Sequence, residues 1–576
     1  MTRADSNNMG SLVQALEHQS TLIGDKTALL QKVRGIWVSL TWSEYFTAVA
    51  EVGEGLVELG VGVGDKVVTL LANSTGLACI DVATQSIGAV SVPLVIETRP
   101  DEVLRLIAEL QPKAIAVQST SWLDLVLEAR STGSIGKDTK IVFVDSAGLH
   151  SYVEESLFSY QELRKLGRSR LLETPTGFKK RFAEIDKSMV ATCVVSSGST
   201  GVSSIFSFSH SQVVEASQSV ATQFPLRVGE LILSQCSYAA PGERAISIYS
   251  ALFTGAIVAF PESQDSAIDA ALEILPHFVH SPVQFLQQVT TKSQRRLEQN
   301  HGLKGLITRQ WQKSIKKSKN QRSGFIGDLL VGRFLIKSLG FQRSRWIISS
   351  GSQLQKNSID FFHELGVNLV DVFTTSRSFG PVMFASSAFG HFDQLMPGFD
   401  ISLTEPNKQM VLSGSSISAT VGNRVTTNDL IEMSDDVIRW SGHPVVMDNP
   451  WNLNDVVIES NVCMSKVISR AIVCHSKAGG RSLVIEVDPI ALTDWATSLN
   501  VPFTTVASLI DVASAQEFIS SEVQTALMRL SDKIVFDSLL VMRRNMSIVA
   551  GELTATGKPR RAAASSIVDG VVITSK

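Results

Sequence analysis

The feature that most constrains the fold is an alternation of helices and short apolar strands near the start of the chain. Helical periodicity covers Leu40 to Gly60, Ala78 to Ile87, Asp101 to Leu110 and Trp122 to Ala129. Apolar runs of strand length cover Val67 to Leu71, Val90 to Val95, Ala114 to Val117 and Ile141 to Val144. Strands that alternate with helices are typical of mainly parallel sheets covered by helices. The sequence therefore predicts an α/β fold.

The first of these helices has recognisable start and stop signals. Thr41 and Glu44 have the spacing of a capping box, and Gly60 follows the last apolar position. Its core stripe is expected to contain Phe46 and Val49. We therefore expect one helix from Leu40 to Gly60, with the capping box at its start.

Length, charge and cysteine content exclude several classes of protein. The 576 residues exceed one hydrophobic core and suggest about three or four compact units. A net charge of -3 gives no general attraction to nucleic acid. The five cysteines form no C-x-x-C pair, so they are expected to be reduced thiols in a cytoplasmic protein. The apolar run from Tyr249 to Phe260 is too short to cross a bilayer and predicts a buried segment.

A loop rich in serine and glycine stands out between two apolar stretches, from Val194 to His210. Its polar centre consists of Ser196, Ser197, Gly198, Ser199, Thr200 and Gly201. Glycines allow close approach of the backbone to an anion, and hydroxyl and amide groups can surround phosphate oxygens. The loop lacks the lysine and the spacing of a Walker motif. By itself it is equally typical of a surface turn.

The segment 292–345 is strongly basic. It contains 14 Lys or Arg residues and two acids, Glu298 and Asp328, which gives 14 − 2 = +12 within a chain of net charge -3. A solvated helical face is the first interpretation of such a segment. The alternative is a peripheral contact with anionic lipid headgroups at the inner face of a membrane.

Fragments along nearly the whole chain resemble adenylate-forming enzymes, and long-chain fatty acyl-CoA synthetases in particular. These fragments are GDKTALL (Gly24 to Leu30), LTWSEYF (Leu40 to Phe46), LGVGVGDKV (Leu59 to Val67), IGAVSVPL (Ile87 to Leu94), GLKGLITRQW (Gly302 to Trp311), RWIISSGSQL (Arg345 to Leu354), IALTDWA (Ile490 to Ala496) and GELTATGKPRR (Gly551 to Arg561). The resemblance implies a large N-terminal domain of stacked, mainly parallel sheets over residues 1–440. It also implies a small mobile α+β domain over residues 441–576.

The same resemblance implies a reaction and its site residues. A fatty acid or other carboxylate would attack ATP to give an acyl-adenylate, and coenzyme A would then displace AMP. Lys558 matches the family's catalytic lysine, and Asp429 matches the carboxylate that binds the ribose. Nucleotide contacts are expected from the loop Ser196 to Gly201 and from Gly351, Ser352, Phe373, Ser376 and Arg377. No nucleic-acid partner is expected.

Several positions depart from the family pattern. Arg377 stands where the glutamate that binds Mg²⁺ is expected, and arginine has no lone pair for a metal. Ser204 replaces the lysine of the phosphate loop, and Ala240 replaces a histidine. No residue is therefore assigned as a metal ligand, although the family chemistry uses Mg²⁺.

These departures leave two classes of function open. The first is an ATP-dependent long-chain fatty acid–CoA ligase with impaired activity. The second is a catalytically silent protein that binds a nucleotide or acyl ligand and serves a regulatory or partner role. Lys558 and Asp429 favour the ligase, whereas Arg377 and Ser204 favour the silent binder. A peptide-synthetase adenylation domain is a third and weaker interpretation.

Overall fold

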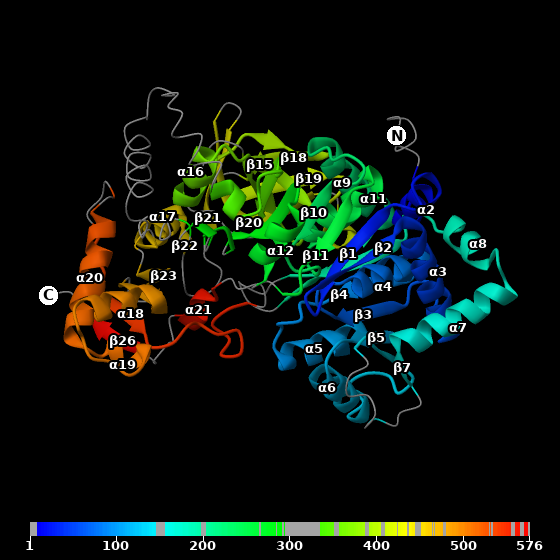
Figure 1. Cartoon of the computed structure of the whole chain (residues 1–576), viewed down its shortest axis with the longest axis horizontal. Coiled ribbons are helices and arrows are strands. Elements are labelled where there is room, and N and C mark those ends of the chain that lie inside the picture. The colour runs from blue at the N-terminus through cyan, green and yellow to red at the C-terminus, as the bar shows by residue number, and fades with distance from the viewer. Residues whose placement is uncertain are drawn as a thin grey trace.

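The computed structural model defines four β-sheets and the helices around them (Figure 1). The residues that it describes are 9–145, 152, 156–196, 203–263, 266–283, 285–287, 289–290, 293, 335–350, 356–385, 391–404, 409–422, 424–434, 437–443, 451–463, 465, 467–475, 480–528, 530, 534–554, 559–564 and 570–573. Most of the basic segment 292–345 lies outside the described residues. The expectation of lipid contact there stays a prediction.

A seven-stranded sheet is built from the region in which alternation was predicted. Its strand order is β7-β6-β5-β3-β4-β8-β9, and every pair is parallel except β8 with β9. Its strands are β3 (Lys66–Leu70), β4 (Val90–Pro93), β5 (Ala114–Val117), β6 (Lys140–Phe143), β7 (Leu157–Ser159), β8 (Val190–Val195) and β9 (Ile205–Ser209). The predicted mainly parallel α/β organisation is confirmed here.

A nine-stranded sheet forms the second large layer. Its order is β17-β15-β14-β13-β12-β10-β11-β1-β2, with parallel pairing from β1 through β14 and antiparallel pairs at both edges. Its strands are β1 (Thr27–Val33), β2 (Ile36–Thr41), β10 (Leu231–Ser234), β11 (Ile257–Phe260), β12 (Phe278–Pro282), β13 (Trp346–Ser350), β14 (Leu369–Thr374), β15 (Pro381–Ala385) and β17 (Gln394–Leu395).

The two large sheets share one hydrophobic core, which alternating side chains of their strands build together. On β13, Ile348 belongs to this shared core, whereas Ile347 faces a second core on the outer side of the nine-stranded sheet. The helices whose side chains enter the shared core are α2 (Leu12–Leu22), α3 (Trp42–Glu58), α4 (Thr75–Ser86), α8 (Gly177–Ala183), α9 (His210–Gln223), η2 (Arg244–Tyr249) and α11 (Ser250–Thr254). The segment Tyr249 to Phe260 contributes largely buried residues, as predicted.

Further helices cover the outer faces of the two sheets. The seven-stranded sheet packs against α5 (Pro100–Leu110) and α6 (Thr120–Ser131). The nine-stranded sheet packs against α12 (Ala267–Ile274) and α16 (Lys356–Glu364). Helix α7 (Tyr160–Glu173) lies along α3, and the single-turn α10 (Pro241–Glu243) precedes η2.

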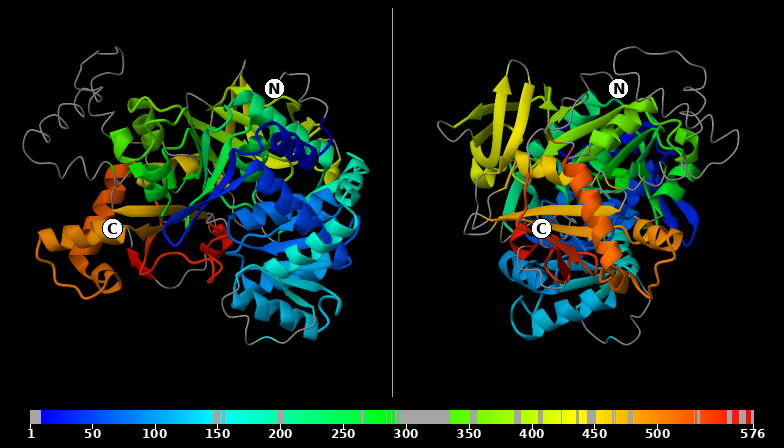
Figure 2. Two further views of the ribbon diagram at one scale, coloured as in Figure 1. Left: turned by 45° about the vertical axis from the view of Figure 1, so that its right-hand side comes forward. Right: turned by 90° about the vertical axis from the view of Figure 1, so that its left-hand side faces the viewer.

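The two remaining sheets follow later in the chain (Figure 2). The third is antiparallel and comprises β16 (His391–Phe392), β18 (Phe399–Leu403), β19 (Gln409–Gly414), β20 (Arg424–Ser434), β21 (Val437–His443) and β22 (Trp451–Asn452), with η3 (Ala419–Val421) between β19 and β20. The fourth comprises β23 (Ile468–His475), β24 (Arg481–Val487), β25 (Ser538–Met542) and β26 (Gly570–Ile573). Its helices are α17 (Leu453–Val462), α18 (Pro489–Ser498), α19 (Val506–Ile510), α20 (Ala513–Leu527) and α21 (Arg561–Ala564). The division expected at residue 440 falls within β21 and stays a prediction.

The predicted capping box at the start of α3 is present. The Thr41 side chain accepts a hydrogen bond from the Glu44 amide, and the Glu44 carboxylate accepts one from the Thr41 amide. The helix begins two residues later than the predicted Leu40, because Leu40 pairs with Leu29 and belongs to β2. Pairing within the β1–β2 hairpin that precedes the helix therefore decided its first residue.

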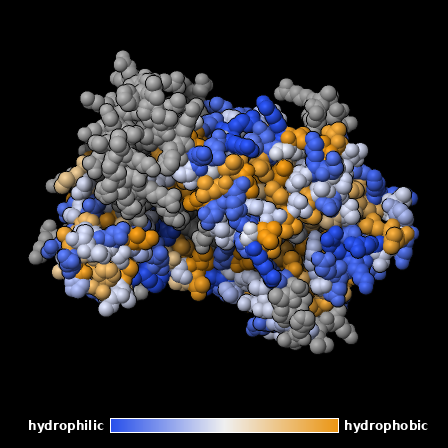
Figure 3. All heavy atoms as spheres, in the orientation of Figure 1, coloured by the Kyte–Doolittle hydropathy of each residue, from blue (hydrophilic) through white to orange (hydrophobic). Residues whose placement is uncertain are grey.

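The outer edge of the nine-stranded sheet exposes apolar side chains. On β2, Ile36 is 69% exposed and Val38 is 53% exposed. Figure 3 shows apolar surface across the middle of the face on which the β1–β2 hairpin lies in Figure 1.

None of the five cysteines, all of which lie in the described residues, forms a disulfide bond, and four of them are buried. In the described part of the chain, none of the helices has the length and apolar character needed to cross a membrane. The expected cytoplasmic location stays a prediction.

Candidate functional site

The base of the predicted phosphate loop is closed by two hydrogen bonds. Strands β8 and β9 pair up to Val195 and Ile205. Beyond this pair, the Ser196 amide donates to the Ser204 carbonyl over 2.8 Å, and the Ser204 amide donates to Ser196 Oγ, also over 2.8 Å. Ser197, Gly198, Ser199, Thr200 and Gly201 lie outside the described residues. The hairpin therefore fixes where the loop leaves and re-enters the sheet.

A single carboxylate joins this loop to the C-terminal region. Glu102, near the start of α5, accepts a hydrogen bond from Ser203 Oγ through one oxygen. Its other oxygen lies 3.2 Å from Arg560 Nη2. Arg105 Nη2 donates to the Ser203 carbonyl over 3.1 Å. We call Glu102, Ser203 and Arg560 the outer cluster.

Arg560 belongs to a short hairpin that contains the Lys558 position. An antiparallel bridge joins Leu553 to Pro559, and the Arg560 amide donates to the Glu552 carbonyl over 2.8 Å. Gly551 has a φ of +75°, and a Cβ atom there would lie 2.8 Å from Arg99 Nη1. Residues 555–558, including Lys558, lie outside the described residues. The described base of the hairpin nevertheless rests against the start of α5.

The predicted nucleotide-binding stretch Phe373 to Arg377 begins at the end of β14 and continues beyond it. The Phe373 ring contacts Phe392 edge to face at 5.9 Å between centroids. Thr375 Oγ1 accepts a hydrogen bond from the Arg377 amide, and the Arg377 carbonyl accepts one from Ser418. The Arg377 guanidinium lies over the ring of Phe206, 5.9 Å from its centroid. Since Phe206 belongs to β9, Arg377 lies beside the strand that follows the phosphate loop.

Asp429 lies on β20, where the pairing with β19 is irregular. Gln409 pairs with Leu430 but Val411 pairs with Thr426, so the strand bulges between these positions. The Asp429 side chain is largely buried, and its amide donates to Thr427 Oγ1 over 3.1 Å. Gly351 and Ser352 lie outside the described residues. The described contacts relate the flank of the Ser196 loop, Arg377 and the base of the Lys558 hairpin.

Two buried titratable groups have strongly shifted pKa values. Burial raises the pKa of Asp371, on β14, to about 8. Burial lowers the pKa of His210 to about 4, and neither of its ring nitrogens has a hydrogen-bond partner among the described residues. His210 follows β9 directly and begins α9. Its surroundings are those of a neutral core histidine, consistent with the absence of a recognisable partner in the sequence.

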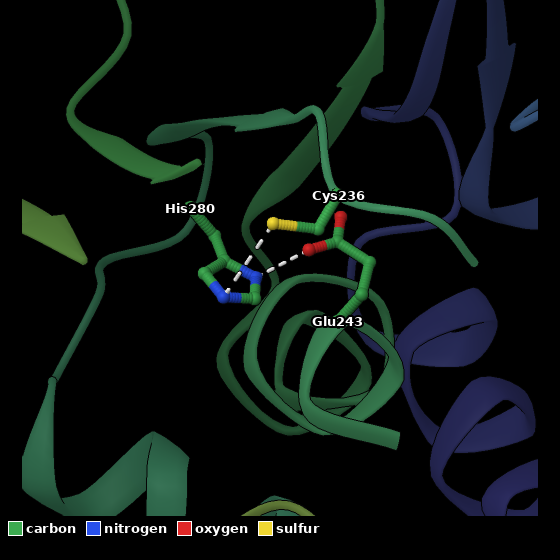
Figure 4. A group of neighbouring side chains, drawn as sticks. All are labelled: Cys236, Glu243 and His280. Atoms are coloured by element: carbon green, nitrogen blue, oxygen red, sulfur yellow. Dashed lines mark hydrogen bonds and ion pairs between the residues drawn. The ribbon is translucent and has the colours of Figure 1, made fainter. Parts of the chain in front are cut away.

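A second polar cluster lies inside the nine-stranded sheet and was missed by the sequence analysis. Glu243 and His280 have side chains with 0% exposure and form a direct hydrogen bond through Nδ1 (Figure 4). His280 Nε2 lies 2.7 Å from Ser350 Oγ. We call Glu243, His280 and Ser350 the inner cluster. Its members are 37 and 70 residues apart in sequence, so no local pattern could have revealed it.

The comparisons with known proteins agree with this architecture. The sequence profile described as "AMP-binding enzyme" matches residues 16–407, which is more than half of the chain. The chain therefore belongs to the AMP-binding enzyme family. It is 23% identical over 415 residues to the long-chain-fatty-acid–CoA ligase FadD15 of Mycobacterium tuberculosis, covering 69% of this chain and 66% of the relative. A probable acyl-activating enzyme 16 of Arabidopsis thaliana is 22% identical over 37% of this chain and 30% of its own length.

Solved structures show the same fold. The adenylation domain of a carboxylate reductase from Mycobacterium chelonae superposes with a TM-score of 0.72 at 16% identity, over 98% of this chain and 91% of that one. The anthranilate CoA ligase AuaEII, in complex with anthranoyl-AMP, gives a TM-score of 0.69 at 14% identity, over 96% of each chain. The predicted adenylate-forming fold is confirmed.

Proposed function

We propose that this protein is an ATP-dependent acid–CoA ligase that acts on long-chain fatty acids. In this reaction a carboxylate oxygen attacks the α-phosphate of ATP, pyrophosphate leaves, and the thiol of coenzyme A then displaces AMP from the acyl-adenylate. The observation that carries the proposal is the outer cluster. In this cluster the Glu102 carboxylate binds both Ser203, beside the Ser/Gly loop, and Arg560, at the base of the Lys558 hairpin.

The chemistry explains why such an arrangement is useful. The first step brings two anions together, so cations and oriented donors must lower the repulsion between them. In our proposal Lys558 supplies the positive charge at the α-phosphate, and the loop from Ser196 to Gly201 supplies hydroxyl and amide donors. Phe373 and Ser376, together with Gly351 and Ser352, would contact the nucleotide, and Asp429 would accept hydrogen bonds from the ribose.

The described residues do not supply the expected magnesium ligand at position 377. The guanidinium of Arg377 is a permanent cation that lies over the ring of Phe206. In the proposed site Arg377 therefore contacts phosphate oxygens directly, because a guanidinium can pair with them through two hydrogen bonds.

The test is product formation by the purified full chain. ATP, coenzyme A, magnesium and one acid at a time (octanoate, palmitate, oleate or benzoate) are incubated with the protein, and AMP and the thioester are quantified by mass spectrometry. We expect both products in equal amounts, with palmitate or oleate favoured. Preference for benzoate would overturn the long-chain assignment, and absence of AMP with every acid would overturn the ligase assignment.

A silent nucleotide or acyl binder is the second candidate, and the described residues give one observation in its favour. Ser204 occupies the position of the family's loop lysine, and its amide is used to close the loop on Ser196. The phosphate loop therefore has one cation fewer than the family pattern. Calorimetric binding of ATP without any AMP formation would favour this candidate.

Lipid contact through the basic segment is a separate proposal. If Lys313, Lys316, Lys317 and Lys319 bind anionic headgroups, added salt should weaken vesicle binding, because exposed charges are screened over about 10 Å at moderate ionic strength. Replacing these four lysines by glutamine should remove the binding. Equal binding to neutral and anionic vesicles would contradict the proposal.

A further inference from the structure

The inner cluster forms a continuous relay of hydrogen bonds. Ser350 Oγ lies 2.7 Å from His280 Nε2, and His280 Nδ1 is hydrogen-bonded to one oxygen of Glu243. The other oxygen of Glu243 accepts a hydrogen bond from Ser234 Oγ. Asn73, in the segment between β3 and α4, donates to Ser234 Oγ over 3.3 Å. Each group between Ser350 and Asn73 in this relay therefore has a hydrogen-bond partner on either side.

These contacts fit one arrangement of the protons. An ionised Glu243 accepts from Ser234 and from the Nδ1–H of a neutral His280, which leaves Nε2 as an acceptor. The hydroxyl of Ser350 then donates to Nε2. This is the order of a hydroxyl nucleophile, a base and an orienting carboxylate, which activates serine for attack on acyl groups in unrelated folds.

The fold places this relay at the candidate site. Ser350 is the last residue of β13 and is only partly buried, whereas His280 and Glu243 are completely buried. It pairs with Val372 on β14, beside Phe373, and the predicted nucleotide contacts Gly351 and Ser352 follow it directly. Thr374 packs against Gly242, next to Glu243.

We propose that Ser350 is a covalent nucleophile that accepts the acyl group from an acyl-adenylate, with His280 as its base and Glu243 as a positioning residue. The identity of the acyl donor rests on the proposed function. The consequence is a second activity, hydrolysis of the activated acid, that competes with transfer to coenzyme A.

The step balances without an added oxidant or reductant. Ser350 Oγ forms a bond to the carbonyl carbon, its proton moves to His280 Nε2, and the bond from that carbon to the phosphate oxygen breaks. AMP leaves, and the proton passes to the departing phosphate. Water then attacks the serine ester, gives a proton to Nε2, and Ser350 recovers its proton as the free acid is released.

Cys236 is a further group near His280 Nε2, but it is a poorer nucleophile than Ser350, whereas Ser247 Oγ lies 3.5 Å from Nδ1, on the side of the ring that Glu243 occupies. The Cys236 sulfur lies 3.8 Å from Nε2 (Figure 4). Burial, together with the charge of Glu243, raises the pKa of the Cys236 thiol well above its ordinary value. The sulfur therefore stays protonated at neutral pH, while the Ser350 hydroxyl is already hydrogen-bonded to the base.

A metal ion is the competing use of the same side chains. Among the described residues, Cys236, Glu243 and His280 offer three ligand atoms within 4.8 Å of one another. The direct hydrogen bond between Glu243 and Nδ1 leaves no space for an ion between them. Nε2 and the cysteine sulfur alone would provide fewer protein ligands than zinc sites commonly use.

The experiment supplies the acyl-adenylate ready-made, so it does not depend on ATP activation. The full chain is mixed with synthetic palmitoyl-adenylate without coenzyme A, quenched in acid and measured by intact mass spectrometry. We expect one palmitoyl adduct per chain, mapped to Ser350 and absent from Ser350→Ala. Replacing the base in His280→Gln should slow adduct formation by at least about 100-fold. Failure of the ligase proposal would leave this result unchanged.

Matched variants separate the nucleophile from its neighbours. Ser349→Ala removes a buried hydroxyl one residue away, for which the described residues provide no hydrogen-bond partner, and should form the adduct normally, as should Cys236→Ala. Glu243→Gln should slow adduct formation, and Glu243→Asp should restore part of the rate, because a carboxylate beside Nδ1 orients the His280 ring. An unmodified wild type, an adduct on Cys236, or a stoichiometric bound zinc ion would each overturn the proposal.

Discussion

The outer and inner clusters are both centred on a glutamate, but they are held in place in different ways. In the outer cluster, the side chains of Glu102 and Arg560 are 16% and 22% exposed, and their residues are 458 positions apart in sequence. In the inner cluster, Glu243 and His280 are fully buried, and both His280 and Ser350 lie on paired strands of one sheet. The outer contact therefore depends on two partly exposed side chains, whereas the inner relay is built into the strands and interior of the sheet.

The largest effect should come from Lys558, which the outer cluster brings toward the phosphate loop in our proposal. Lys558→Ala should lower acyl-adenylate formation by about 100- to 1000-fold, the range seen when one donor to a developing charge is lost. Transfer of a supplied acyl-adenylate to coenzyme A should stay near the wild-type rate. Pyrophosphate release and thioester formation measure the two steps separately. Lys576→Ala serves as the control, and equal losses in both steps would contradict the assignment.

Arg377 should have the next largest effect, on ATP binding. Loss of its charge-assisted hydrogen bonds to phosphate in Arg377→Ala should weaken binding by roughly 10- to 100-fold, from about 1.5–3 kcal/mol. Calorimetric titration with and without magnesium is the measurement. Wild-type binding that persists in a metal chelator is expected. An unchanged affinity in the variant would show that the guanidinium only packs on Phe206.

The ionisation of Asp371 reports whether water reaches the protein interior beside the inner cluster. Its folded-state pKa of about 8 lies above the ordinary value, so its neutral form stabilises the fold at low pH and this contribution is lost as pH rises. From about pH 7 to about pH 9, the wild type should lose about 1 kcal/mol of unfolding free energy relative to Asp371→Asn. Urea unfolding at each pH gives the comparison. Parallel pH profiles would mean that water reaches the carboxylate.

The smallest effect should come from the outer ion pair itself. A partly exposed pair of this kind contributes about 0.5–1 kcal/mol. Glu102→Gln and Arg560→Ala should each lower the adenylation rate only a few-fold, and the double variant should be no worse than the more affected single variant. Added salt should lower the adenylation rate of the wild type toward the rates of the variants. Fully additive losses would mean that the two side chains act independently.

The sequence predicted the elements of the first large sheet closely because their signals are local. Ala114 to Val117 is the strand that was predicted, and the capping box at Thr41 is present. The resemblance also predicted the adenylate-forming fold correctly, since fragments in a conserved order constrain topology even when each is weak. The start of α3 was misplaced because Leu40 is paired with Leu29, a contact that helical periodicity cannot report.

The sequence by itself therefore determined the α/β class, the family and the positions at which this chain departs from the family pattern, Arg377 and Ser204 among them. Those properties depend on residue identity and short-range periodicity. Only the tertiary structure decided that Glu102 meets both Ser203 and Arg560, and that His280 lies between Glu243 and Ser350. Both arrangements result from strand order and from contacts between segments far apart in the chain, which bring together side chains whose spacing in the sequence carries no periodic signal.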